Sequence, residues 1–158
     1  MIRELTATDA AASFEAMVAL RTGLADADDY IQCVEAQMRD GYRLVASFDD
    51  ALDTAAAVVG FRLASNLAWG RFLYIDDLST LPSARGRGHA TALLTWVADE
   101  AARLGVDAVH LDSGSTPARH DAHALYHRHG YRVTSFHFAL PVTAHIAASS
   151  GRVAAERA

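Results

Sequence analysis

Two glycines and two arginines stand together in the run Arg85-Gly86-Arg87-Gly88, directly before a helix-like segment. The first N–H groups of a helix are unpaired, and the positive end of its dipole attracts anions. Glycine lets the backbone approach a ligand closely, and arginine offers paired donors that suit phosphate oxygens. The turn from Arg85 to Ala90 therefore predicts a binding site for a phosphate-bearing ligand.

Two common nucleotide-binding motifs can be compared with this turn. A P-loop needs a lysine after its last glycine, but the chain contains no lysine. A dinucleotide-binding turn needs a third glycine, where this chain has Thr91, and the strands before the turn look antiparallel. Both motifs are disfavoured, but the turn is still compatible with a ligand that carries a diphosphate.

An acidic pair and a tyrosine are the candidates for proton transfer. Asp76 and Asp77 lie in a strand-like apolar segment, where a carboxylate is unfavourable unless it is solvated or paired. Each is a candidate general base or anchor for an amine, or else the partner of an arginine. Because neighbouring strand residues point to opposite faces, we expect only one of them to face a given pocket. Tyr126 could donate a proton to a leaving thiolate, although an aromatic residue there could also be core.

Histidines follow one face of a short helix-like segment. His120, His123 and His127 fall at positions i, i+3 and i+7, and the spacing of His123 and His127 can chelate a metal. The glutamate of a zinc-protease motif is absent from the intervening residues. A pocket lining or a solvated helix face is the simpler reading, so no metal is expected.

The elements that position these residues follow from periodicity and turn residues. A helix capped by Thr8 and ended by Gly23 is expected near the N-terminus, and the strand over 55–64 is interrupted by Gly60. Further helices are expected over 26–39, 91–104 and 120–128, and further strands over 2–6, 42–48, 71–81, 106–111 and 130–140. The segment from 71 to 111 is a βαβ unit with a parallel strand pair.

Length and charge indicate one soluble domain. The 158 residues carry a net charge of −5, which argues against wrapping nucleic acid or an anionic membrane. The single cysteine, Cys33, permits no internal disulfide, so a cytoplasmic location is the simple expectation. No apolar run approaches the ~20 residues of a membrane span. We expect a domain over residues 1–143 and a tail over 144–158.

Two segments resemble the signatures of the GNAT superfamily, the Gcn5-related N-acetyltransferases. Residues 78–90 resemble its acetyl-CoA motif, Arg/Gln-x-x-Gly-x-Gly/Ala after a strand, and residues 122–131 resemble its Ala-x-x-x-Tyr-x-x-x-Gly-Phe/Tyr segment. The resemblance implies an α+β, three-layer fold with about four helices. Its mixed, mostly antiparallel central sheet would have six to seven strands and would splay between the fourth and fifth.

The resemblance also implies roles for the candidate residues. Acetyl-CoA would be the co-substrate, and a primary amine of a small molecule would attack it by direct transfer. Tyr126 would protonate the departing thiolate, and Asp76 ranks above Asp77 as the base, often acting through water. Asp76, Asp77, His120 and His123 would contact the acceptor. The cofactor-binding residues would be Leu78, Ser79, Thr80, Arg85, Gly86, Arg87, Gly88, His89, Ala90 and Thr91.

Several alternatives stay open. Many family members have an asparagine where this chain has Arg119, and the run 119–123 instead resembles the aminoalkylphosphonate acetyltransferases, which raises small anionic amines as acceptors. A non-catalytic acyl-CoA sensor is a second reading of the same motif. A toxin-type enzyme that acetylates aminoacyl-tRNA is a third, against which the acidic balance weighs. Homodimers are common in such families, so a homodimer stays open, and the sequence does not name the acceptor.

Overall fold

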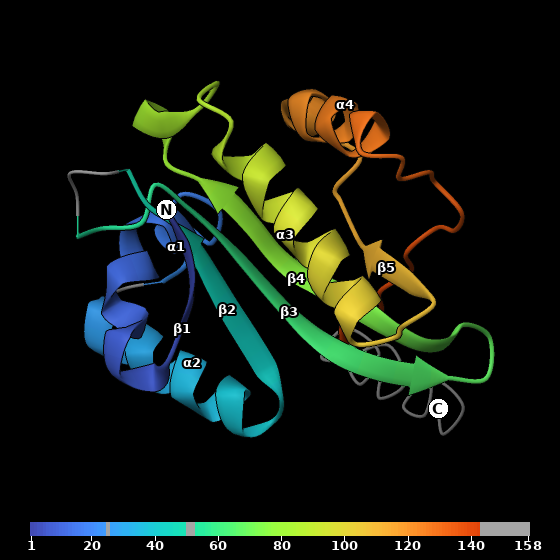
Figure 1. The fold of residues 1–158 in the computed structure, drawn as a ribbon, viewed down its shortest axis with the longest axis horizontal. Helices are drawn as coiled ribbons and strands as arrows, with labels where there is room; N and C mark the ends of the chain where they lie inside the picture. Colours follow the sequence, from blue (N-terminus) through green and yellow to red (C-terminus); the bar gives the residue numbers. More distant parts are fainter. Residues whose placement is uncertain (25, 50–52, 143–158) are drawn as a thin grey trace, which may run out of the picture.

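Five strands form one mixed sheet, and the computed structural model describes residues 1–24, 26–49 and 53–142 (Figure 1). The strands lie in chain order across the sheet, and all neighbours are antiparallel except the last pair, β4 and β5. The prediction of six to seven strands was therefore wrong for the described residues. The strands are β1 (Ile2–Leu5), β2 (Tyr42–Ser47), β3 (Ala57–Asn66), β4 (Gly70–Thr80) and β5 (Ala108–Leu111).

Helices cover both faces of the sheet, which confirms the predicted α+β fold with three layers and four α-helices. Helices α1 (Phe14–Val18) and α2 (Ala27–Arg39) pack on one face with the 3₁₀ helix η1 (Ala7–Ser13). Helix α3 (His89–Arg103) packs on the other face, and α4 (His120–Arg128) lies beside it (Figure 1). Two 3₁₀ turns, η2 (Pro82–Ala84) and η3 (Pro117–Arg119), precede α3 and α4. No described helix has the length and apolar character that a membrane crossing needs.

Two cores separate these layers. The cluster under α1 and α2 includes Tyr30, Val34 and Tyr42, each at most 3% exposed. The cluster under α3 includes Phe61 and Leu93, both fully buried. Because each strand contributes alternate side chains to the two clusters, the sheet is apolar on both faces. The residues between β4 and α3 thus follow a strand that is packed on both faces of the sheet.

The start of the chain differs from the prediction. Thr6, not Thr8, caps the first helical segment, and the Asp9 carboxylate accepts a hydrogen bond from the Thr6 N–H in a capping box. The segment then winds as a 3₁₀ helix before it becomes α1, which ends at Val18 rather than near Gly23. Helix α2 agrees with the helix predicted over 26–39, and the Asp26 side chain caps it by accepting a hydrogen bond from the Asp29 N–H.

The predicted last strand over 130–140 is absent. The chain leaves α4 at Arg128 and continues through residues 131–141 without regular structure. The alternating β-branched and aromatic residues do favour a strand, but a strand also needs a neighbour for its backbone groups. Within the part of the chain that the structure describes, no strand pairs with this segment. The predicted tail over 144–158 lies outside the described residues.

Candidate active site

Strands β4 and β5 pair only briefly and then separate. Their register runs from Phe72 opposite Ala108 to Ile75 opposite Leu111, where β5 ends. Strand β4 continues to Thr80, so beyond Ile75 one of its edges faces no strand among the described residues. This confirms the predicted splay between the fourth and fifth strands. The unpaired edge at Leu78, Ser79 and Thr80 leaves backbone groups available to a ligand.

A β-bulge lies at the point where the two strands separate. Gly60 of β3 lies opposite Asp77, whereas the next residue, Phe61, lies opposite Ile75. Asp76 is therefore an extra residue in β4, and the usual alternation is interrupted there. As a result Asp76 and Asp77 both line one cavity. The expectation that only one of them could face a given pocket was wrong, because it assumed an unbroken strand.

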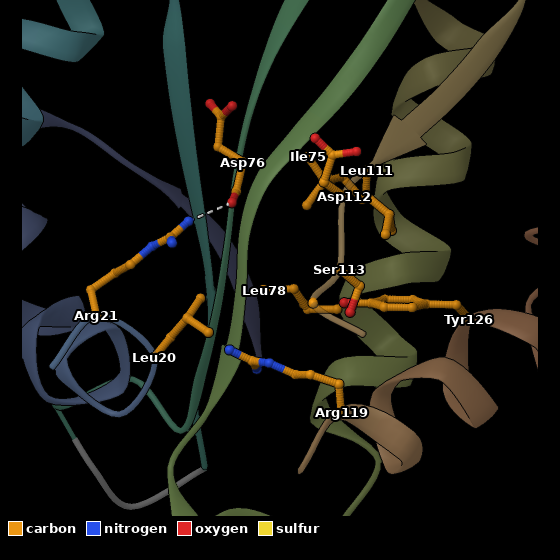
Figure 2. A pocket seen from close by; sticks show the side chains of 11 residues that line it. Leu20, Arg21, Ile75, Asp76, Leu78, Leu111, Asp112, Ser113, Arg119 and Tyr126 are labelled. Carbon is orange, nitrogen blue, oxygen red and sulfur yellow. Dashed lines mark hydrogen bonds between the residues drawn. The ribbon is translucent and has the colours of Figure 1, made fainter. Parts of the chain in front are cut away.

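A small cavity, here called the fork cavity, occupies the gap between the two strands (Figure 2). Its volume is about 130 Å³. Figure 2 shows Tyr126 and Arg119 entering from the α4 side and Arg21 entering from the opposite side. The cavity thus joins residues that are far apart in the chain. Its lining consists of Leu20, Arg21, Ile75, Asp76, Leu78, Leu111, Asp112, Ser113, Gly114, Arg119 and Tyr126.

A larger cavity, here called the helix-side cavity, lies between β4 and the helices α1 and α2. Its volume is about 560 Å³, within the range of small-molecule sites. It shares Arg21 and Asp76 with the fork cavity, so these two residues lie at the border of the two spaces. The remaining lining is Met17, Gly23, Leu24, Tyr30, Cys33, Val34, Gln37, Tyr42, Arg62 and Asp77.

The two carboxylates differ in how many of their oxygens are engaged. Both oxygens of buried Asp77 accept hydrogen bonds, Oδ1 from Arg21 Nε at 2.7 Å and Oδ2 from the Tyr42 hydroxyl at 2.9 Å. Asp76 accepts from Arg62 Nε through Oδ2 at 2.7 Å, and its Oδ1 has no protein partner among the described residues. Burial raises the pKa of Asp76 above its ordinary value, although Arg62 opposes the shift. Asp76 is therefore the more available base.

Arg21 also fixes the backbone at the bulge. Its guanidinium donates to the main-chain oxygen of Asp76 at 2.9 Å, and Figure 2 shows this bond. In the same view the Asp76 carboxylate points away from Tyr126. The two candidate proton carriers consequently lie on different sides of the strand. Arg21, Arg62 and Tyr42 were not identified from the sequence, since no motif marks residues that act by pairing with an acid.

Tyr126 lies in α4 and lines the fork cavity beside Leu78 and Ser113 (Figure 2). Its hydroxyl has no hydrogen-bond partner within the described part of the protein. Burial raises the pKa of Tyr126, and the Arg119 charge opposes this shift. The phenol is therefore neutral at physiological pH and free to donate its proton toward the cavity.

The glycine-rich turn has the geometry of an anion site. Gly86 and Gly88 have φ angles of +74° and +88°, which L side chains rarely adopt, and Gly88 is the N-cap of α3. A β-carbon on either glycine would meet nothing within 4 Å, so the space above the turn is open. The N–H groups in the first turn of α3 lack helical partners. These observations fit the pyrophosphate of a coenzyme A molecule.

The polar side chains of this turn are partly held by the protein itself. Arg87 donates to Asp49 Oδ1 at 2.7 Å. His89 contacts the same oxygen through Nε2 at 3.2 Å, and its Nδ1 lies 2.9 Å from the Ser47 hydroxyl. Asp49, which lies just after β2, thus orients the arginine and the histidine. Arg85 ends η2 and precedes the two glycines, whereas Ala90 and Thr91 lie in the first turn of α3.

The histidines of α4 do not reach either cavity. His123 Nε2 lies 3.1 Å from the Ser113 hydroxyl and 3.0 Å from the Gly114 carbonyl, so it ties α4 to the loop after β5. His127 Nδ1 instead contacts the Tyr131 carbonyl at 3.1 Å. His120 and His123 contact each other only loosely, with ring centroids 6.4 Å apart. Among the residues with a described placement, no three His, Cys, Asp or Glu side chains gather as metal ligands would.

Comparison with known proteins identifies the family. Residues 12–131 match the model of the acetyltransferase (GNAT) family. The chain belongs to this family. A Bacillus subtilis relative, the uncharacterized N-acetyltransferase YhdJ, is 32% identical over 144 residues, which are 89% of this chain and 98% of that protein. This GNAT chain is therefore an N-acetyltransferase.

Two further similarities are more limited. The aminoalkylphosphonate N-acetyltransferase of Salmonella typhimurium is 36% identical over 64 residues, which are 40% of each chain. A Clostridium acetobutylicum acetyltransferase solved with acetyl-CoA has the same fold, with a TM-score of 0.68 and 15% identity over 90% of this chain and 96% of that one. GNAT acetyltransferases use acetyl-CoA, and the open turn before α3 is the part of this GNAT protein that suits it.

Proposed function

We propose that the protein transfers the acetyl group of acetyl-CoA directly to a primary amine of a small molecule. The observation that carries this proposal is the pair of cavities that meet at Arg21 and Asp76. The fork cavity, which contains Tyr126, is the candidate site for the thioester. The helix-side cavity, with its volume of about 560 Å³, is the candidate site for the acceptor.

The turn from Arg85 to Ala90, with Thr91, would hold the pyrophosphate of acetyl-CoA. Its glycines allow a close approach, and the first N–H groups of α3 point toward an anion there. The unpaired edge of β4 at Leu78, Ser79 and Thr80 would bind the pantetheine arm and the acetyl group. Bound in this way, acetyl-CoA supplies a thioester carbonyl that an amine can attack.

Residues of the two cavities would carry out two different proton transfers, one at the amine and one at the leaving sulfur. An acceptor amine enters as an ammonium ion and gives up two protons as the C–N bond forms. Asp76, which has a free oxygen and a raised pKa, takes one proton and passes it to solvent. Because its carboxylate points away from Tyr126, a water molecule bridges Asp76 and the amine. As the C–S bond breaks, Tyr126 donates its proton to the sulfur and regains one from the reacting amine through solvent.

The lining of the helix-side cavity favours an amine that also carries an apolar portion. Leu24, Val34 and Tyr30 form its apolar wall. Elsewhere in the same lining, Asp77 accepts hydrogen bonds from Arg21 and Tyr42 and adds negative charge near the amine. The partial similarity to an aminoalkylphosphonate N-acetyltransferase makes small anionic amines a class to test first. His120 and His123 line neither cavity. Their predicted contact with the acceptor is therefore not supported by the two cavities and stays a prediction.

An amine-panel assay tests this proposal. The protein is incubated with acetyl-CoA and with aminoalkylphosphonates, polyamines, amino sugars and peptide N-termini, while free thiol and product mass are followed. We expect acetylation of a small primary amine and intersecting initial-velocity lines, as a ternary complex requires. Parallel lines together with loss of turnover in Cys33→Ser would instead show an acetylated cysteine, because Cys33 also lines the helix-side cavity. Binding of acetyl-CoA without turnover of any amine would contradict the proposal.

A further inference from the structure

Arg119 brings a positive charge into the fork cavity from the same helix as Tyr126. It is the last residue of η3 and the N-cap of α4, and Tyr126 lies about two helical turns further along the chain. The two side chains therefore extend from one face of the helix. Both line the fork cavity, and Figure 2 shows them pointing the same way across the gap between the separated strands.

Local contacts fix the place from which the Arg119 side chain starts. The Arg119 N–H donates to the Thr116 carbonyl at 2.9 Å, and Pro117 begins the 3₁₀ turn between these two residues. The Arg119 stem passes over Gly114, since a β-carbon there would meet Arg119 Cγ at 3.8 Å. His123 holds the next turn of α4 to the Gly114 carbonyl at 3.0 Å. The arginine thus extends into the cavity from a loop that is held at several points.

The charge of Arg119 acts inside the cavity, at the position of the phenol. Burial raises the pKa of Tyr126, and the Arg119 charge opposes this rise. The other arginine of the lining, Arg21, is instead paired with Asp77 at 2.7 Å. Arg119 is therefore placed to meet a negative charge that forms beside Tyr126.

Acetyl transfer creates a negative charge at this place. In the proposed function, on which the following inference rests, an amine adds to the thioester carbonyl and the C–S bond then breaks. The electron pair of that bond leaves with the sulfur as a thiolate, and Tyr126 supplies the proton that converts the thiolate to a thiol. Until the proton arrives, the sulfur is charged in a cavity of about 130 Å³, which holds only a few water molecules to solvate it.

We propose that Arg119 is a catalytic residue whose guanidinium stabilises the coenzyme A thiolate as it leaves. A neighbouring cation favours the ionised form of a thiol, and a donor that already points toward a developing charge lowers the barrier without rearrangement. Tyr126 transfers a proton, whereas Arg119 keeps its protons and supplies a permanent charge. The neutral sulfur of bound acetyl-CoA gains little from that charge. Arg119 therefore acts on the transition state and on the product rather than on donor binding.

The binding of coenzyme A and of desulfo-coenzyme A, which lacks the sulfur, tests Arg119 without an acceptor. Both ligands meet the same charged and titratable groups in the fork cavity, so the ratio of their dissociation constants isolates the thiol. Those groups are Arg21, Asp76, Asp112, Arg119 and Tyr126. A free thiol such as that of cysteine has a pKa near 8.5, and a cation beside it lowers that pKa. The bound thiol then ionises before the free one, so binding of coenzyme A tightens as the pH rises.

Titration calorimetry with the full chain measures this effect. The preference of the wild type for coenzyme A over desulfo-coenzyme A should grow about fivefold between pH 7 and pH 9.5. In Arg119→Gln the preference should not grow, while the affinity for desulfo-coenzyme A stays within about twofold of the wild type, which also shows that the variant folds. Arg119→Lys keeps the charge and should retain part of the effect. Arg128→Gln is the matched control, because Arg128 ends the same helix and lines neither cavity.

The failure of this role and the failure of acetyl transfer give different results. A wild-type preference that does not change with pH, or an equal growth in Arg119→Gln, would overturn the role of Arg119 and leave acetyl transfer intact. A wild type that binds neither ligand would overturn both.

Turnover of an amine that the panel assay identifies gives a second measurement. Arg119→Gln should lower kcat about 10-fold or more and leave the KM for acetyl-CoA within about twofold, because the charge forms only as the C–S bond breaks. Arg128→Gln should leave both constants unchanged. An unchanged kcat in Arg119→Gln, with the wild type active on the same amine, would overturn the role of Arg119 alone.

Discussion

The Tyr42 side chain occupies the space that a β-carbon on Gly60 would need. The nearest atom is the Tyr42 hydroxyl oxygen, which donates to Asp77 Oδ2 at 2.9 Å. Gly60 lies opposite Asp77 at the bulge, so the glycine, the tyrosine and the carboxylate form one tightly packed group. Burial and the nearby Asp77 raise the pKa of Tyr42 well above its usual value, which keeps the phenol protonated as a donor.

Gly60→Ala should therefore lower the free energy of unfolding by about 1–3 kcal/mol, since the added methyl group displaces Tyr42. Urea unfolding measures this change. Gly23→Ala is the matched control, because a β-carbon at Gly23 meets nothing within 4 Å, and it should remain within about 0.5 kcal/mol of the wild type. Equal stability of the two variants would contradict the packing described for Tyr42.

Asp76→Asn tests the proposed base. The substitution should lower kcat/KM about 100-fold, since an amide accepts no proton. The pH profile gives the sign of the effect: a carboxylate acts as a base only when ionised, and burial raises the pKa of Asp76. Wild-type activity should thus fall as the pH decreases through that raised pKa, above the ordinary value near 3.9. This acidic limb should be missing from Asp76→Asn.

Asp77→Asn is the comparison for this experiment. Both Asp77 oxygens are engaged by Arg21 and Tyr42, so its loss should reduce stability more than it reduces turnover. Unfolding and activity are measured for both variants. Retention of the acidic limb in Asp76→Asn, together with its loss in Asp77→Asn, would assign the base to Asp77.

Tyr126→Phe should lower kcat about 100-fold and leave the KM for acetyl-CoA within about twofold of the wild type. The variant keeps the ring that lines the fork cavity and removes only the hydroxyl proton. Tyr131→Phe is the control, since its ring packs 5.9 Å from that of Tyr126, and burial raises the pKa of Tyr131 to about 12. Unchanged turnover in Tyr126→Phe, or an equal loss in both variants, would remove the general-acid role.

Arg87→Ala tests the anion site. It should raise the KM for acetyl-CoA roughly 10-fold, as expected for the loss of a charged hydrogen bond to phosphate. The KM for acetyl-pantetheine, which has no pyrophosphate, should not change. Arg103→Ala at the other end of α3 is the control and should affect neither donor. An equal rise in KM for both donors would show that Arg87 acts on the thioester end instead.

Local sequence predicted the elements that depend on neighbouring residues. The helices predicted over 26–39 and 91–104 correspond to α2 (Ala27–Arg39) and α3 (His89–Arg103), and the periodic apolar positions of α3 form its buried face, because helical periodicity acts over only a few residues. The turn from Arg85 to Ala90 and the position of Tyr126 in α4 were predicted in the same way, from two motifs. Their proposed roles remain to be tested by the variants above.

Only the tertiary structure decided how Asp76 and Asp77 are oriented. The bulge depends on the pairing of β3 with β4 and on the close approach of Tyr42 to Gly60, which are contacts between distant segments. The partners Arg21 and Arg62 come from other elements for the same reason. Residues 132–141 show the converse: they have the sequence pattern of a strand, but a strand forms only where a neighbour supplies the other half of its hydrogen bonds.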